Sequence, residues 1–345
     1  MIEVDYSPTL FEYAFGVPPV KGTIRSCPED FLVDEILGFT AEGVGEHFLV
    51  HLRKKNTNTD WLARQLAKFV EIKPMDVSYA GLKDRNAITT QWFSVRIPGL
   101  GEPEWERFST EDYQVISATR HSRKLRRGSL KGNMFSLVVR DVQGDFSTLE
   151  QRLSEIKQDG VPNYFGEQRF GREGDNLKMA GKMFVEGLRI KNRQKRSLYI
   201  SAARSFLFNV VCSERIKNNN WQAGMDGEAM MLAGSHSFFV AEKIDADIKS
   251  RLAQNDILPT GPLWGRGELP STAECRIFEH DLLQAYPEWL SGLEQIGLKQ
   301  ERRALCVKPT DFSWQLDEQQ NTLNLQFTLP PGSYATSVLR EIVDY

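Results

Sequence analysis

Strand-like sequence occupies both ends of this chain and helix-like sequence fills the middle, and this division constrains the fold more than any other feature. Apolar and polar residues alternate over His47–Arg53, as they do in a half-buried strand. From about residue 159 the chain has helical periodicity instead, as in Ser201–Lys217. Strand-like segments return after Lys308, at 312–316 and 322–329. The pattern predicts a core formed by both ends of the chain and interrupted by an insertion.

The 345 residues exceed the usual size of a single hydrophobic core, so two domains are expected. The predicted fold is α+β, with a mixed or antiparallel sheet flanked by helices. We expect residues 1–158 and 309–345 to form this core, and residues 159–308 to form a more helical α/β insertion. One core helix is predicted to start from an N-cap at Thr59 or Asp60, with Trp61 and Leu62 on its apolar face. A capping box at Ser271–Glu274 predicts a helix in the insertion.

Composition indicates a soluble protein. Apolar residues make up 41% of the chain and charged residues 26%, and no apolar run is long enough to span a bilayer. The acidic N-terminus lacks a signal-peptide pattern, and the four cysteines form no CxxC pair, so we expect a cytoplasmic protein with free thiols. The five histidines show no ligand spacing, and no GxGxxG or GxxxxGK[ST] loop is present. We therefore expect no metal, no cofactor, no membrane association and no obligate protein partner.

One carboxylate, Asp84, lies in a short predicted loop between two strand-like runs, Val77–Ala80 and Gln91–Val95. Gly81 permits a tight backbone path just before it. Two strands can present a reactive acid in this way. Taken alone, the loop is better explained as a solvated turn in which the Asp side chain caps its own backbone.

Two basic runs without an acid contrast with the overall net charge of −3. They span Arg120–Lys131 and Arg189–Arg196. Such runs either form solvated faces or bind an anionic partner such as a nucleic-acid backbone. The candidate backbone contacts are Arg123, Lys124, Arg126, Arg127, Lys131, Arg193, Lys195 and Arg196.

Five segments in order resemble the tRNA pseudouridine synthase D (TruD) family, and together they cover essentially the whole chain. The resemblance implies a pseudouridine synthase core broken by a family-specific domain. It also implies an isomerase that converts a uridine of tRNA, at position 13 of the D arm in bacterial members and including tRNA-Glu, to pseudouridine. The matching segments are Ala80–Arg85 with Thr89 and Gln91, Pro28–Phe31, Gly132–Phe135, Asn163–Gly171 and Pro331–Thr336.

The resemblance places Asp84 at the catalytic aspartate, and it places Phe31, Asn133 and Tyr334 at positions that contact the target nucleotide. Relatives carry Phe where this chain has Tyr334, which leaves the contact of its hydroxyl open. Arg25 stands where a bacterial relative has Lys, and a catalytic role is not assigned to it. Without the resemblance, Phe31 and Phe135 would be interpreted as core aromatics of strands.

The chemistry agrees with these residues. Pseudouridine forms when the bond from C1′ to N1 breaks, the uracil turns and C5 takes the place of N1, with no net redox change. The reaction needs a carboxylate near the ribose, either to attack C1′ or to remove a proton from C2′, and the sequence leaves both routes open. The base must also leave its stack, and an aromatic platform such as Phe31 or Tyr334 then compensates for the lost stacking, while Asn133 binds the uracil edge. Lys83, Arg85 or another cation would balance the charge of Asp84.

Three alternatives remain. An RNA-binding protein could keep the fold without catalysis. A hydrolase could pair Asp84 with Asp30 or Asp34. A methyltransferase is disfavoured because a glycine-rich cofactor loop is missing.

Overall fold

The computed structural model describes residues 11–99 and 101–345. The chain divides into two compact units, each formed by separate segments. The sheet unit contains Pro19–Leu153, Pro309–Gly332 and Val343–Tyr345, and the helical unit contains 11–18, Ser154–Lys308 and Ser333–Ile342. Residues 11–18 and 333–342 thus group with the helical unit, whereas the sequence placed them with the core. The predicted domain limits at 158/159 and 308/309 stay a prediction.

The sheet unit is formed around one mixed sheet with the strand order β14-β15-β7-β2-β5-β3-β6. Strand β1 pairs with β7, β16 pairs with β1, and β4 pairs with β5. Most neighbouring strands are antiparallel, while β2 runs parallel to β5. The strands are β1 (Val20–Ile24), β2 (Phe31–Ile36), β3 (His47–Lys55), β4 (Val77–Tyr79), β5 (Ile88–Arg96), β6 (Tyr113–His121), β7 (Gly132–Gly144), β14 (Thr310–Asp317), β15 (Thr322–Leu329) and β16 (Val343–Asp344).

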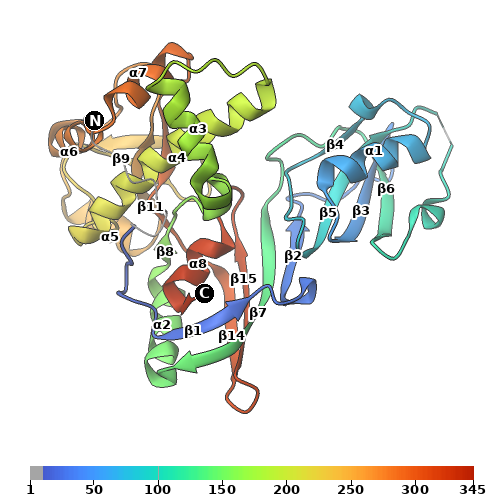
Figure 1. The fold of residues 1–345 in the computed structure, drawn as a ribbon, viewed down its shortest axis with the longest axis horizontal. Helices are drawn as coiled ribbons and strands as arrows, with labels where there is room; N and C mark the ends of the chain where they lie inside the picture. The colour runs from blue at the N-terminus through green and yellow to red at the C-terminus, as the bar shows by residue number, and fades with distance from the viewer. Residues whose placement is uncertain (1–10, 100) are drawn as a thin grey trace. The chain divides into compact units, whose positions relative to one another are not determined.

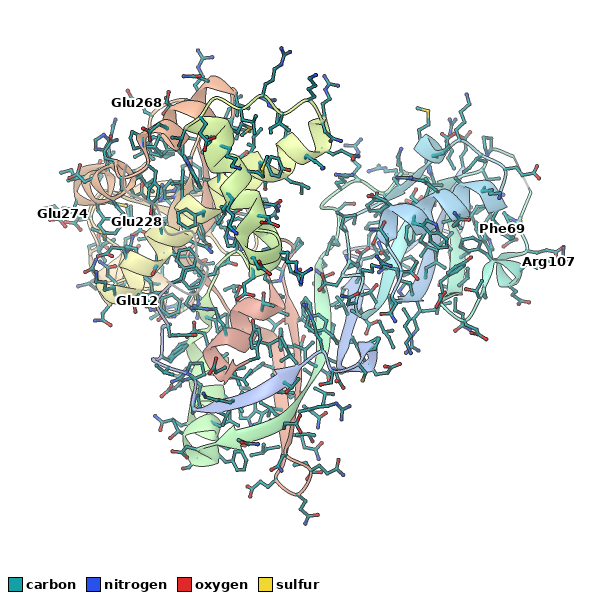
Figure 2. All side chains as sticks on the ribbon, viewed as in Figure 1. Glu12, Phe69, Arg107, Glu228, Glu268 and Glu274 are labelled. Carbon is teal, nitrogen blue, oxygen red and sulfur yellow. The ribbon has the colours of Figure 1, made fainter. Side chains whose placement is uncertain are left out.

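Helix α1 (Thr59–Phe69) covers the part of the sheet formed by β3, β4 and β5 (Figure 1). Its Leu62 and Leu66 are fully buried against strand residues such as Phe93. Phe69 at the end of the helix packs on Phe108, with ring centroids 5.1 Å apart (Figure 2). This apolar contact fixes α1, which borders the loop that carries Asp84.

Two details of the predicted helix starts are wrong. The N-cap of α1 is Asn58, whose side chain accepts a hydrogen bond from the Trp61 amide, and Trp61 itself is 46% exposed. Asn and Asp are about equally good N-cap residues, so a shift of the helix start by one residue changes the stability of the helix little. The predicted capping box at Ser271–Glu274 is also not formed, because the Ser271 hydroxyl donates to buried Glu279 instead.

The helical unit is arranged around α4 (Arg193–Lys217), which runs through it in Figure 1. A small sheet with the order β10-β9-β11-β12 packs on this helix, and β8 pairs with β13. The elements are β8 (Val161–Pro162), α3 (Asp175–Phe184), β9 (Glu228–Leu232), β10 (Phe238–Ala241), α5 (Ala246–Ala253), β11 (Ile257–Leu263), α6 (Ala273–Leu283), α7 (Pro287–Gln295), β12 (Glu301–Ala304), β13 (Cys306–Val307) and α8 (Ala335–Ile342). Helix α2 (Phe146–Asp159) is shared by the two units: its residues up to Leu153 belong to the sheet unit, and those from Ser154 belong to the helical unit.

Buried ion pairs connect these elements. Glu228 on β9, labelled in Figure 2, accepts two hydrogen bonds from Arg215 of α4, and both side chains are fully buried. Arg302 on β12 pairs in the same way with Glu279 of α6. Removing one member would leave an uncompensated buried charge, so these pairs make the arrangement of the strands and helices specific. No helix of the described part of the chain is long and apolar enough to cross a membrane.

Candidate active site

Asp84 lies in the loop between β4 and β5, as the sequence predicts. The two strands pair antiparallel, with Val77 opposite Val95 and Tyr79 opposite Phe93. The Asp84 side chain is 32% exposed, so it is held by the protein and still open to solvent. The strand pair therefore presents this carboxylate from a fixed base.

Hydrogen bonds from two buried polar residues hold the backbone of the loop. Gln91 on β5 donates to the Gly81 carbonyl at 3.4 Å. Thr59 at the start of α1 accepts from the Lys83 amide at 3.2 Å and donates to the Gln91 side chain at 2.9 Å. The loop is thus tied to both the sheet and α1.

The buried ammonium of Lys54 holds the next residue of the loop. Lys54 lies on β3 and donates to the carbonyls of Thr57, at 2.8 Å, and Asp84, at 3.0 Å. Burial lowers the pKa of Lys54 to about 8. Lys54 thus holds the backbone of Asp84 in place, although burial of its charge destabilises the folded protein.

The carboxylate of Asp84 forms an ion pair with Arg25. The guanidinium Nη2 lies 3.0 Å from Asp84 Oδ2, and the Arg25 side chain is 27% exposed. Arg25 has a φ of 58°, in the left-handed region that residues other than glycine rarely adopt and that costs on the order of 1 kcal/mol or more. The cationic partner that the sequence left open is therefore Arg25, held in an unfavourable backbone conformation.

The two cations next to Asp84 in sequence have other partners. Lys83 forms a buried ion pair with Glu35 of β2, which also accepts from the Trp92 amide. Arg85 donates to the carbonyl of Asn56 at 3.4 Å. Lys83 and Arg85 therefore stabilise the loop through contacts to other parts of the sheet unit.

Phe31 is joined to Asp84 through Arg25. The guanidinium lies 4.2 Å from the centroid of the Phe31 ring, within the range of a cation–π contact. The Phe31 ring also packs edge-to-face against Phe135, with the ring centroids 6.3 Å apart, and Phe31 is only 2% exposed. The Phe31 ring is thus covered by Arg25 in the structure as it stands.

Asn133 occupies the position opposite Glu35 where β7 pairs with β2. Its side-chain oxygen Oδ1 is buried and has no hydrogen-bond partner among the residues that the structure describes. A buried amide oxygen without a partner is costly, so it is expected to accept a hydrogen bond in the bound state. An N–H of a uracil is such a donor.

Tyr334 precedes α8 and is held by a second motif of the sequence. Its hydroxyl accepts from Arg169 Nε at 3.0 Å and from Nη2 at 2.7 Å. Its ring meets Phe165 edge-on at 6.0 Å. A Cβ at Gly166 would clash with the Thr336 hydroxyl and lie 3.1 Å from the Tyr334 ring, which explains this glycine. The sequence left the contact of the Tyr334 hydroxyl undecided, and in the structure this hydroxyl accepts hydrogen bonds from Arg169.

The first basic segment forms an exposed loop between β6 and β7. Its amide at Gly128 donates to the Ala80 carbonyl at 2.8 Å, so the loop is joined to the segment that leads to Asp84. Next to it is a cavity of about 420 Å³. The predicted backbone contacts Arg123, Lys124, Arg126, Arg127 and Lys131 are all exposed. The charged and aromatic residues that line the cavity are Asp60, Arg64, Tyr79, Lys124, Arg126 and Arg127.

The second basic segment forms the first turn of α4. Arg193, Lys195 and Arg196 are exposed there, and the first turn carries no acidic residue. Asn192 caps the helix by accepting from the Lys195 amide at 3.0 Å. Cations are unfavourable at this end of a helix, and an anion offsets them.

One carboxylate of the hydrolase alternative is already neutralised. Asp30 is buried and accepts three hydrogen bonds from Arg140, at 2.7 to 3.0 Å. The contact with Arg140 lowers the pKa of Asp30. An acid of this kind does not donate a proton across a scissile bond, and the geometry therefore disfavours a mechanism that pairs Asp84 with Asp30.

Two residues of this site went unassigned in the sequence, and of these Lys54 had a recognisable signal. Lys54 continues the inward alternation of Val50 and Leu52 on β3, and a lysine on the buried face of a strand requires internal acceptors. Arg25 stands close before the Pro28–Phe31 segment, but its contact to Asp84 spans 59 residues and depends on its positive φ. The sequence alone does not show that conformation.

Comparison with known proteins identifies the family. The family model of tRNA pseudouridine synthase D (TruD) matches residues 9–189 and 175–342. Among curated relatives, a tRNA pseudouridine synthase D of Nitrosococcus oceani is 50% identical over 330 residues, which is 95% of this chain and 92% of that protein. One of Methylococcus capsulatus is 46% identical over 332 residues, or 96% of this chain and 94% of that protein.

The chain belongs to the tRNA pseudouridine synthase D family. A crystal structure of a TruD-family protein from Methanosarcina mazei is 22% identical and superposes with a TM-score of 0.71 over 98% of both chains, which shows the same fold. The α+β fold and the isomerase activity predicted from the sequence are thereby confirmed. The individual site residues stay predictions.

Proposed function

We propose that Asp84 is the catalytic carboxylate of this tRNA pseudouridine synthase, and that its target is a flipped-out uridine at position 13 of the D arm, including that of tRNA-Glu. The observation that carries the assignment is the geometry of Asp84. Its backbone is fixed by Lys54 and its carboxylate by Arg25, while a third of the side chain stays open to solvent. A reactive group needs this combination of fixed position and access.

Arg25 has two roles in the proposal. In the free enzyme it balances the charge of Asp84 and covers the ring of Phe31. When the uridine enters, the base stacks on Phe31 or Tyr334, and Asn133 Oδ1 accepts from the uracil edge. Asp84 then acts on the ribose, either at C1′ or at the C2′ proton, the C1′–N1 bond breaks, and C5 forms the new bond to C1′. The C5 proton leaves to solvent and N1 takes up a proton.

The exposed cations of both basic segments bind the phosphate backbone of the tRNA. This contribution is largely independent of sequence and weakens with salt. Recognition of the D arm then depends on its shape and on unstacked bases. The proposed backbone contacts are Arg123, Lys124, Arg126, Arg127, Lys131, Arg193, Lys195 and Arg196.

Tritium release tests the proposal directly. A tRNA-Glu transcript with tritium at C5 of its uridines is incubated with the wild type and with Asp84→Asn. We expect release from the wild type, loss of release in Asp84→Asn, and no release when uridine 13 is replaced by cytidine. Release undiminished in Asp84→Asn would reject Asp84, and release that survives loss of uridine 13 would reject the target. A tRNA-binding wild type without release would support the alternative, an RNA-binding protein without catalysis.

A further inference from the structure

Two arginines beside Tyr334 carry positive charge without an acidic partner. Neither Arg169 nor Arg303 forms an ion pair with a carboxylate of residues 11–99 or 101–345. Most arginines of the described interior do have one, as Arg215 has Glu228 and Arg302 has Glu279. An arginine cluster without an acid is therefore unusual within this fold.

The partners of both guanidiniums are neutral oxygens. Arg169 donates to the hydroxyls of Tyr334 and Ser201, the latter at 2.9 Å. Arg303 donates to Asn163, with Nε to the carbonyl at 3.1 Å and Nη2 to the side-chain Oδ1 at 2.6 Å. These bonds hold the side chains in place but leave their charge uncompensated.

An aromatic ring brings the two arginines together. The guanidinium carbons of Arg303 and Arg169 lie 4.1 Å and 5.5 Å from the centroid of the Phe165 ring. Both residues are half-buried, and the guanidinium of Arg303 is the more strongly desolvated of the two. Burial lowers the pKa of Arg303 to about 10, as expected for a cation without a counter-charge.

Donors remain available on both guanidiniums. The bonds that Arg303 forms use Nε and Nη2, and no described bond uses its Nη1. Arg169 uses each nitrogen, but its Nη atoms carry a second N–H each. A guanidinium fork of this type can bind two oxygens of a phosphate, and both arginines pack against the same Phe165 ring.

We propose that Arg169 and Arg303 bind one phosphate of the tRNA backbone next to the nucleotide contacted by Tyr334. The inference rests on the proposed function for the identity of the ligand, because tRNA is the phosphate-bearing substrate. The phosphate supplies the missing counter-charge, and Arg169 joins this contact to Tyr334 through the tyrosine hydroxyl. The pair is a binding and positioning element, and it lies outside the two basic segments.

The test measures the tRNA dissociation constant of the full-length protein as a function of salt concentration. For Arg169→Gln and Arg303→Gln we expect about tenfold weaker binding at 0.1 M salt and a log–log salt slope smaller by about 0.7 to 0.9, the loss of one phosphate contact. Arg169→Lys keeps the charge but not the fork, so it should recover the slope and only part of the affinity. The control is Arg276→Gln, which removes an exposed cation of the helical unit. Arg276 is paired with Glu268, so the affinity and the salt slope of this variant should match those of the wild type.

A second measurement covers variants that fold poorly. Inorganic phosphate should raise the melting temperature of the wild type more than that of Arg169→Gln, relative to chloride at equal ionic strength. If Arg303→Gln is unfolded by circular dichroism, the two Arg169 variants decide the question. If Arg169→Gln binds tRNA with the affinity and the salt slope of the wild type, the phosphate site is rejected.

The outcomes separate this inference from the proposed function. A wild type that releases tritium, together with arginine variants that bind tRNA like the wild type, rejects the phosphate site and leaves the assignment of Asp84 intact. A wild type that binds tRNA with the expected dependence on Arg169 but releases no tritium rejects the catalytic proposal and leaves the phosphate site.

Discussion

The cations near Asp84 and the cations near Tyr334 are neutralised in opposite ways. Near Asp84, Lys83 pairs with Glu35 and Arg25 pairs with Asp84 itself. Near Tyr334, Arg169 and Arg303 have only neutral oxygens as partners. The two ion pairs near Asp84 are complete within the protein and fix a geometry, whereas the arginines near Tyr334 are completed by an anionic ligand. Lys54 is the exception near Asp84, because its buried ammonium donates only to carbonyl oxygens. Charge balance thus separates the side-chain ion pairs of this region from the arginines near Tyr334.

The largest effect is expected from breaking the pair of Lys83 and Glu35. Lys83→Met leaves a fully buried carboxylate without its cation, and the free energy of unfolding should fall by about 4 kcal/mol in urea titrations. Arg96→Met is the matched control, because Arg96 and its partner Glu46 are exposed and their pair contributes less than about 1 kcal/mol. Equal losses in the two variants would contradict the structural role of the buried pair.

Removal of Arg25 tests the second acid-paired cation. Arg25→Gln should lower the single-turnover rate of tritium release about 100-fold, equivalent to about 2.7 kcal/mol, because Asp84 loses its orienting ion pair. Affinity for tRNA should change less than the rate. Arg25→Lys should restore part of the rate, since it returns the charge. If Arg25→Gln instead weakens binding and leaves the rate unchanged, Arg25 is a substrate contact and does not position Asp84.

Lys54 gives the Asp84 region a pH dependence. Its pKa is about 8 in the folded protein and near ~10.5 when unfolded, so the unfolded state binds more protons between these values and stability rises with pH there. Below pH 8 the penalty for the buried charge is fully present. From pH 7 to pH 10 the wild type should gain about 2 kcal/mol relative to Lys54→Met, measured by urea unfolding at each pH. A constant difference across this range would show that Lys54 is not a desolvated cation.

The smallest effect should come from the cluster without an acid. Arg169→Gln breaks hydrogen bonds to neutral hydroxyls and leaves no buried carboxylate behind, so the free energy of unfolding should fall by only about 1 kcal/mol. Urea unfolding without tRNA measures this loss. A loss as large as that of Lys83→Met would mean that Arg169 is a structural cation, and the contrast between the two regions would disappear.

The strands around Asp84 were predictable, since the strand-like runs on either side of the Gly81 turn indicate β4, the loop and β5. The sequence also predicts that two separate segments supply Asp84 and Tyr334. It does not predict which partners hold them, because the Arg25 pair spans 59 residues and the Arg169 contact to Tyr334 spans 165. Such pairs are fixed by tertiary packing and by a positive φ at Arg25, and neither leaves a periodic signal in the chain.

The order of the strands has a consequence for how the protein is made. One edge of β7 pairs with β2, and the other edge pairs with β15, from Leu323 opposite Val139 to Leu329 opposite Asn133. The ribosome adds residues 145–321 between these partners, which takes roughly 10 to 35 seconds at about 5–20 residues per second. Throughout that interval the nascent chain presents an open strand edge, the kind of surface on which chains aggregate. Translation speed and chaperone access over the insertion should therefore influence the yield of folded enzyme.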